Sequence, residues 1–104
     1  MPATYQQNAA VFKAFCDENR LRILELLQDG SLCACVLTEK LGIKQSALSY
    51  HMKVLVASGI VEGTAVGKWM HYRISETGCE NALTLLRQLT AVRAAENTTC
   101  ACPV

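Results

Sequence analysis

The fold of this chain is decided by the stretch LGIKQSALSYHMKVLVASG, residues 41–59. Its Gly42-Ile43 pair predicts a tight turn after a short helix over residues 33–41, because glycine readily adopts the positive φ that ends a helix. A second helix is predicted from Gln45 to Ser58 and is closed by Gly59. A short helix, a glycine-containing turn and a second helix together form a helix-turn-helix.

The second of these helices has two chemically different faces. Leu48, Met52 and Leu55 recur at helical spacing and predict a buried stripe. The outward positions carry polar groups, and Gln45 lies at the exposed N-terminal end. These outward residues are Ser46, Ser49, Tyr50 and Lys53.

After Gly59 the hydrophobic period changes from helical to alternating. Met70, Tyr72 and Ile74 fall on one face of a strand predicted over residues 69–74. Residues 60–65 are expected to pair with this strand as a hairpin, across a turn at residues 66–68. A hairpin placed directly after a helix-turn-helix predicts a wing.

Helices are predicted on both sides of this unit. The first runs from about Tyr5 to Cys16, and Asp17 is the predicted N-cap of the next, which ends at Asp29-Gly30 with the glycine left-handed. A last helix begins near Glu76. Its apolar stripe is too extensive for one small domain to cover, which indicates packing against a symmetry mate. The stripe consists of Ala82, Leu85, Leu86, Leu89 and Val92.

Charge is unevenly distributed along a chain whose net charge is only +1. Five basic residues lie between positions 40 and 73 against one acidic residue, Glu62, so one face can be basic. Hydroxyl and amide groups on the second helix can reach phosphates or base edges, and lysines suit phosphate oxygens. The residues expected to contact double-stranded DNA are Gln45, Ser46, Ser49, Tyr50, Lys53 and Lys68.

The predicted fold class is therefore mainly α with a β-hairpin, a dimeric winged helix-turn-helix. Residues 1–95 are expected to form the DNA-binding and dimerisation domain, and residues 96–104 a cysteine-containing C-terminal tail. A chain of 104 residues is long enough for one such domain with a modest core.

Six cysteines in so short a chain would indicate a disulfide framework in a secreted protein. The N-terminus, however, has neither a basic n-region nor an apolar h-region, and no stretch is long and apolar enough to span a membrane. We therefore expect a cytoplasmic protein with reduced thiols. In that compartment the pairs Cys33-Ala34-Cys35 and Cys100-Ala101-Cys102 indicate ligands or redox sensors.

Three segments resemble the ArsR/SmtB family of metal-responsive repressors: DENRLRIL at residues 17–24, QSALSYHMKVL at 45–55 and GKWMHYRI at 67–74. The resemblance spans most of residues 10–92. It implies a homodimeric repressor that binds an inverted-repeat operator without a cofactor, catalyses no reaction, and leaves DNA when an ion binds.

The resemblance also implies the effector and its ligands. In members that respond to arsenite, antimonite, cadmium or lead, a Leu-Cys-x-Cys motif opens the helix before the recognition helix, and Leu32-Cys33-Ala34-Cys35 stands in that place. As(III) or Sb(III) is therefore the expected effector, with Cd(II) and Pb(II) as alternatives. Arsenite-responsive members carry a third cysteine three positions after the second, where this chain has Thr38.

The third ligand is left open at this point. Two thiolates alone are one alternative, and a third thiolate supplied within the chain or across a dimer is the other. The candidates for that third thiolate are Cys16, Cys100 and Cys102.

Physical chemistry supports Cys33 and Cys35 as ligands, because soft thiolates select soft ions and a helix N-terminus lowers the pKa of a thiol. Side chains two residues apart point to nearly opposite sides of a regular helix, so we expect the first turn to distort when both bind one ion. The two histidines, His51 and His71, are assigned to the recognition helix and the wing, and Trp69 to packing.

Two alternative functions remain at the level of sequence. One is a repressor of the same fold that senses oxidants through disulfide or persulfide formation among the same cysteines. The other, from a different class, is a thiol enzyme or a metal-transfer protein. Against the second stand the absence of a Cys-x-x-Cys motif after a strand and of any acid-base constellation.

Overall fold

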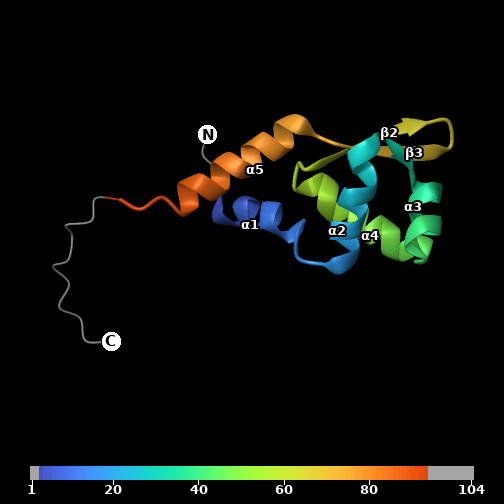
Figure 1. Ribbon diagram of the computed structural model, residues 1–104, viewed down its shortest axis with the longest axis horizontal. Coiled ribbons are helices and arrows are strands. Elements are labelled where there is room, and N and C mark those ends of the chain that lie inside the picture. Colours follow the sequence, from blue (N-terminus) through green and yellow to red (C-terminus); the bar gives the residue numbers. More distant parts are fainter. Residues whose placement is uncertain (1–2, 94–104) are drawn as a thin grey trace.

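The computed structural model describes residues 3–93 of the 104-residue chain. Helices dominate this part, and a small sheet lies at one end of it, beside α3 (Figure 1). The elements in chain order are α1 (Tyr5–Lys13), α2 (Glu18–Leu26), the 3-10 helix η1 (Leu27–Asp29), β1 (Leu32–Cys33), α3 (Ala34–Leu41), α4 (Gln45–Ala57), β2 (Val61–Val66), β3 (Trp69–Ile74) and α5 (Glu76–Leu89).

The helix-turn-helix is present as the sequence predicted. Gly42 closes α3 in the left-handed conformation, with φ 67° and ψ 32°, and its N–H bonds to the carbonyl of Thr38. Leu37 and Leu41 of α3 are buried against the apolar stripe of α4, in which Leu48, Met52 and Leu55 are buried. This packing sets the angle at which α4 presents its opposite face.

One core holds the described elements together. Its fully buried members come from α2, η1, α3, α4, the start of β2 and the turns before β2 and after α1. Each fully buried Leu or Ile of such a core is worth about 1.5–3 kcal/mol relative to exposure. The buried apolar residues are Ala14, Ile23, Leu27, Leu37, Leu41, Leu48, Met52, Leu55, Ile60 and Val61.

Two predicted boundaries of the first helices are wrong. The first helix ends at Lys13 and not at Cys16: Phe15 and Cys16 follow in turns, because the chain must bend so that Asp17 can cap α2. Asp17 is the N-cap as predicted, accepting the N–H groups of Asn19 and Arg20. Gly30 has φ 132° and ψ −176°, which is not the left-handed cap predicted there, because η1 already ends the helix.

The sheet has three strands where the sequence predicted two. The hairpin of β2 and β3 is antiparallel, with Val61 opposite Ile74 and Val66 opposite Trp69, and Gly67 turns it at φ 63°. The short β1 adds to the other side of β3, giving the order β1-β3-β2, with Leu32 opposite Tyr72 and Cys33 opposite His71. The wing is therefore joined to the start of α3 by a strand pair.

The last helix packs close to the end of α4 and then leaves the core, with α1 beside it (Figure 1). A Cβ at Gly78 would overlap the carbonyl of Gly59, so only glycine permits this approach. Further along α5, Leu83, Leu86 and Leu89 are each about half exposed. Val92, predicted to extend the stripe, lies beyond the helix end. Among the described helices, none has the length and apolar character that crossing a membrane requires.

Candidate metalloid site and DNA-binding surface

The structure brings Cys33 and Cys35 together at the start of α3. Cys33 is the N-cap of the helix, with extended backbone angles of φ −69° and ψ 147°, and its sulfur accepts the N–H of Cys35 at 3.4 Å. The two Sγ atoms lie 2.7 Å apart. Cys35 is exposed and Cys33 is half-buried, so the pair is accessible from solvent.

This geometry corrects the expectation that the first turn must distort before both sulfurs reach one ion. The expectation assumed helical backbone angles at both cysteines. Because Cys33 precedes the helix and is extended, its side chain turns back over the first turn and meets that of Cys35. The two sulfurs are therefore already adjacent in the structure, and the first turn of α3 keeps its regular form.

The two thiols differ in acidity. The hydrogen bond with the Cys35 thiol lowers the pKa of Cys33, and the backbone N–H groups of Cys35 and Val36 lower it further, against an opposing effect of desolvation. The same sulfur-sulfur hydrogen bond raises the pKa of Cys35, with desolvation and the neighbouring Cys33 charge adding to the effect. The sulfur-sulfur hydrogen bond therefore favours ionisation of Cys33 over ionisation of Cys35.

Other predicted ligands do not join the pair within the described chain. The Cys16 thiol donates to the carbonyl of Phe12 at 3.3 Å, and the connection between α1 and α2 that carries it lies well away from α3 (Figure 1). Cys79 is half-buried in α5. Cys100 and Cys102 lie outside the described residues. Across residues 3–93, no three His, Cys, Asp or Glu side chains cluster as metal ligands would.

A pocket of about 370 Å³ opens directly beside Cys35. Three elements form its walls: α3, the turn into the recognition helix α4 together with the start of that helix, and the wing. Trp69 of β3, predicted to serve in packing, is 49% exposed and forms the wing side of this pocket. The lining residues are Ala34, Cys35, Thr38, Ile43, Gln45 and Trp69.

The predicted DNA-contact residues lie on accessible surface. All of those on α4 are exposed, and Lys68 is exposed in the hairpin turn. The helix begins after Lys44, and no side chain caps it, whereas side chains cap α1, α2, α3 and α5. Its first N–H groups are therefore open to an external acceptor such as a phosphate oxygen.

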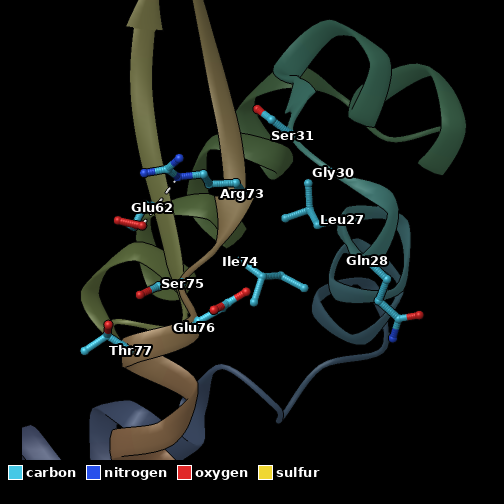
Figure 2. A pocket seen from close by; sticks show the side chains of 10 residues that line it. All are labelled: Leu27, Gln28, Gly30, Ser31, Glu62, Arg73, Ile74, Ser75, Glu76 and Thr77. Atoms are coloured by element: carbon cyan, nitrogen blue, oxygen red, sulfur yellow. Dashed lines mark ion pairs between the residues drawn. The ribbon is translucent and has the colours of Figure 1, made fainter.

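A larger pocket of about 820 Å³ lies elsewhere, between η1, the base of the hairpin and the start of α5 (Figure 2). Arg73 and Glu62 face each other across the hairpin there, 3.5 Å apart, and both are more than 45% exposed. An exposed ion pair of this kind contributes at most about 1 kcal/mol. None of the predicted site residues lines this pocket.

A buried polar network behind α4 was missed at the level of sequence. Arg20 of α2 donates from Nε to the Lys13 carbonyl at 3.0 Å and from its guanidinium to Nδ1 of His51 at 2.9 Å. Arginine only donates, so Nδ1 accepts, and Nε2 carries its proton toward Asp17, 3.9 Å away. His51 is 8% exposed and faces inward, toward Arg20 and Asp17. Its spacing of three and four from Leu48 and Leu55 is the signal that would have placed it there.

Comparison with known proteins decides the family. Residues 17–63 match the family model described as "Bacterial regulatory protein, arsR family". An arsenical resistance operon repressor of Staphylococcus aureus is 38% identical over 69% of this chain and 69% of its own. An HTH-type transcriptional regulator of Methanocaldococcus jannaschii is 36% identical over 82% of this chain and 97% of its own. The chain belongs to the arsR family.

Solved structures agree with this assignment. An ArsR-like transcriptional regulator from Rhodococcus sp. RHA1 has a TM-score of 0.70 and 30% identity, over 82% of this chain and 78% of that one. HlyU from Vibrio cholerae has a TM-score of 0.65 and 30% identity, over 88% of this chain and all of that one. The winged helix-turn-helix prediction is confirmed, and an arsR-family protein of this kind is a DNA-binding transcriptional regulator and not an enzyme.

Proposed function

We propose that this protein is a dimeric repressor that binds an inverted-repeat operator and leaves it when As(III) or Sb(III) bonds to Cys33 and Cys35. The observation that carries the proposal is the adjacent sulfur pair, 2.7 Å apart, on the helix that packs directly behind the recognition helix. Cd(II) and Pb(II) are alternative effectors, because they are also thiophilic. Relatives named arsenical resistance operon repressors, from Staphylococcus aureus and Bacillus subtilis at 38% and 41% identity, support it.

DNA binding is assigned to the exposed face of α4 and to the wing. In this arrangement α4 enters the major groove, where Gln45 and Ser49 meet base edges. Lys53 and Lys68 contact phosphates, and the uncapped start of α4 adds backbone N–H donors. Ser46 and Tyr50 complete the contact surface.

Dimerisation is assigned to α1 and α5. A pocket of about 450 Å³ with apolar walls lies between them, lined in part by Phe12, Phe15, Leu83 and Leu86, and Leu89 continues the exposed face. A dimer related by twofold symmetry buries such a face on both subunits and places two α4 helices for two half-sites.

Release follows from linkage between two ligands. An ion that lowers operator affinity by a given factor must bind the DNA-free protein more tightly by the same factor. β1 supplies a physical link, because Cys33 is at once an effector ligand and the strand partner of His71 in the wing. A shift of Cys33 on ion binding therefore acts on the wing as well as on α3.

A thiol-redox sensor is the second candidate function, and the lowered pKa of Cys33 beside a second sulfur favours it. One titration separates the two. Operator DNA, selected from a random duplex library, is followed by fluorescence anisotropy with arsenite, antimonite, cadmium, lead, zinc and hydrogen peroxide added separately. Release by arsenite under reducing conditions supports metalloid sensing, whereas release by peroxide alone supports redox sensing.

A further inference from the structure

We propose that His51 is a positioning residue for DNA binding: its neutral form holds the recognition helix α4 on Arg20, and its protonation releases this hold and weakens operator binding. The inference goes beyond the proposed function, because it involves neither the cysteines nor an ion. It rests on that function only through the assignment of DNA contacts to α4 and of dimerisation to α1.

Arg20 lies between α1 and α4 and binds both. Its Nε–H donates to the carbonyl of Lys13, the last residue of α1, and its guanidinium donates to Nδ1 of His51 in α4. Arg20 and His51 are 6% and 8% exposed, so water competes little for these hydrogen bonds. Through Arg20, therefore, α4 is fixed relative to α1, the helix assigned to dimerisation.

Two charged groups face the imidazole, both from the start of α2. The guanidinium of Arg20 is 2.9 Å from Nδ1, and the carboxylate of Asp17 is 3.9 Å from Nε2. On its own helix the imidazole meets the ring of Tyr50 edge to face, with the ring centroids 5.6 Å apart. The other elements packed against α4 are α1, α3 and β2. Among residues 3–93, they place no charged side chain in a hydrogen bond or ion pair with His51.

Protonation reverses the sign of the contact with Arg20. Arginine only donates, so Nδ1 must be unprotonated to accept from it. A proton on Nδ1 removes the acceptor and places two cations in contact at a buried position, where little water screens them. The Asp17 carboxylate attracts the charged ring at the same time. Both effects move the imidazole away from Arg20 and toward Asp17.

The proposed DNA-contact face lies on the same turn of α4. Ser49, Tyr50 and Lys53 are within two positions of His51, and all three are exposed. Movement of the imidazole acts directly on Tyr50 through the edge-to-face contact. Because Arg20 also ties α4 to α1, the same movement changes the separation of the two α4 helices in the proposed dimer.

The sign of the pH dependence follows from this arrangement. The neutral form of His51 is the form that binds DNA well, so operator affinity is complete at alkaline pH. Affinity is lost as the pH falls through the range in which histidine side chains gain a proton, about pH 8 to pH 5. By linkage, bound operator must in turn hold His51 in its neutral form.

The test measures operator affinity by fluorescence anisotropy at about pH 8 and about pH 5.5, at constant salt, with a reductant and a chelator present. We expect the parent to bind at least about tenfold more weakly at the lower pH, because each of the two subunits takes up a proton when the operator leaves. Far-UV circular dichroism is recorded at both pH values. A loss of helix signal that accompanies the loss of affinity would overturn the proposal, because unfolding would then explain it.

The chain offers a matched pair of variants, because His51 and His71 are its two histidines. In His51→Asn the side-chain amide oxygen takes the place of Nδ1 and can accept from Arg20, but it cannot gain a proton. This variant should lose less than about threefold in affinity between the two pH values. His71→Asn changes the half-buried histidine of the wing and should keep the parental ratio of affinities.

A measurement on the parent decides the matter if His51→Asn does not fold. The Cε1–H resonances of the two imidazoles are followed by isotope-edited NMR as the pH is lowered, and the resonance missing from His71→Asn identifies the wing histidine. The His51 resonance should titrate over the range in which affinity falls, and excess operator should move its midpoint to lower pH. A His51 imidazole that keeps one protonation state while affinity falls would overturn the proposal.

The remaining outcomes separate this inference from the function on which it rests. If the parent binds its operator equally at both pH values, or if His51→Asn loses affinity as the parent does, the role of His51 is overturned and the DNA-binding assignment stands. If arsenite does not release the operator while the pH dependence follows His51, the proposed effector fails and the positioning role stands. Absence of operator binding by the parent at the higher pH overturns both.

Discussion

The two helices of the helix-turn-helix begin in opposite ways. At α3 the Cys33 sulfur caps the helix and accepts an N–H, and a strand pair ties the same residue to the wing. At α4 no side chain caps the helix, and the first turn is exposed. The start of α3 is capped by a soft sulfur atom, whereas the start of α4 leaves its N–H groups free to bind a hard anion such as phosphate. The difference teaches that the proposed effector site and the proposed DNA contacts can lie at two different helix starts, separated by the length of α3 and the turn after it.

The largest effect is expected when the α3 start is changed alone. Cys33→Ser or Cys35→Ser should raise the arsenite concentration needed for release by about a hundredfold or more, since serine offers a hard, protonated oxygen. Operator affinity should stay within about threefold of the parent, because neither residue lies on the outward face of α4. Anisotropy measures both quantities, and Cys79→Ser is the matched control. If the Cys33 variant were released by arsenite as readily as the parent, the effector site would not lie at the start of α3.

A second, smaller effect tests whether DNA binding at the start of α4 and arsenic binding at the start of α3 require a partner subunit. Leu89→Glu places a charge on the exposed stripe of α5 and should give a monomer in analytical ultracentrifugation. Operator affinity should fall by at least about thirtyfold, because one half-site offers too little surface and too few phosphates.

The arsenic content of the same variant refines the comparison. If Cys33 and Cys35 bind arsenic within one chain, the Leu89→Glu monomer should still bind one arsenic per chain. Loss of arsenic binding with loss of the dimer would instead show that the third ligand comes from the partner subunit. Gln28→Glu, which adds the same charge on η1, should remain a dimer and serves as the control.

The third effect concerns the α4 start and its surroundings. Lys53→Ala or Lys68→Ala should weaken binding to all DNA sequences by several fold. Either change should also reduce the slope of the logarithm of the binding constant against the logarithm of the salt concentration by about one. Gln45→Ala should instead change base preference. Arsenic binding should be unaffected in all three. The exposed Lys13 at the end of α1 provides a control, Lys13→Ala, for which a parental salt slope is expected.

The smallest effect is expected behind α4, at the carboxylate that caps α2. Desolvation acts to raise the pKa of Asp17, but the N–H groups of Asn19 and Arg20, with the neighbouring His51 and Arg20 side chains, lower it below the ordinary value for an aspartate. A depressed pKa means that the stabilisation is present above about pH 4 and is lost as the pH falls through the lowered pKa. Asp17→Asn keeps a capping oxygen and should flatten this decline, as measured by urea unfolding between pH 7 and pH 3. An unchanged pH dependence would show that Asp17 contributes nothing through its charge.

The sequence predicted the helices and strands whose apolar residues repeat at a regular spacing, and it missed the element too short to show such a repeat. The stripe of Leu48, Met52 and Leu55 predicted α4 because three buried turns repeat one signal. β1 has two residues, too few for any period, and its partner in β3 lies about forty positions away. Such a strand exists only because the tertiary fold places β3 beside it, so local pattern could not predict it.

The same limit explains the outcome at the candidate site. Composition and resemblance selected Cys33 and Cys35, but their closeness depends on one backbone conformation, the extended N-cap. The sequence placed the helix start at Cys33, one position too early. With helical backbone angles at Cys33, the two side chains would point apart, whereas in the structure they meet. His51 shows the converse case. Its spacing from Leu48 and Leu55 places it on the buried face of α4, but its polar ring led to an assignment without burial.

The pairing of β1 with β3 fixes the number of residues that can precede Cys33, as strictly as its chemistry fixes the residue type at that position. Only Gly30 and Ser31 connect η1 to β1. An insertion of one residue there, if the strand slipped to absorb it, would exchange the sheet faces of Leu32 and Cys33, because neighbouring side chains alternate. A leucine would then stand at the start of α3 where the sulfur now stands. Substitutions in this loop are therefore tolerable where insertions and deletions are not.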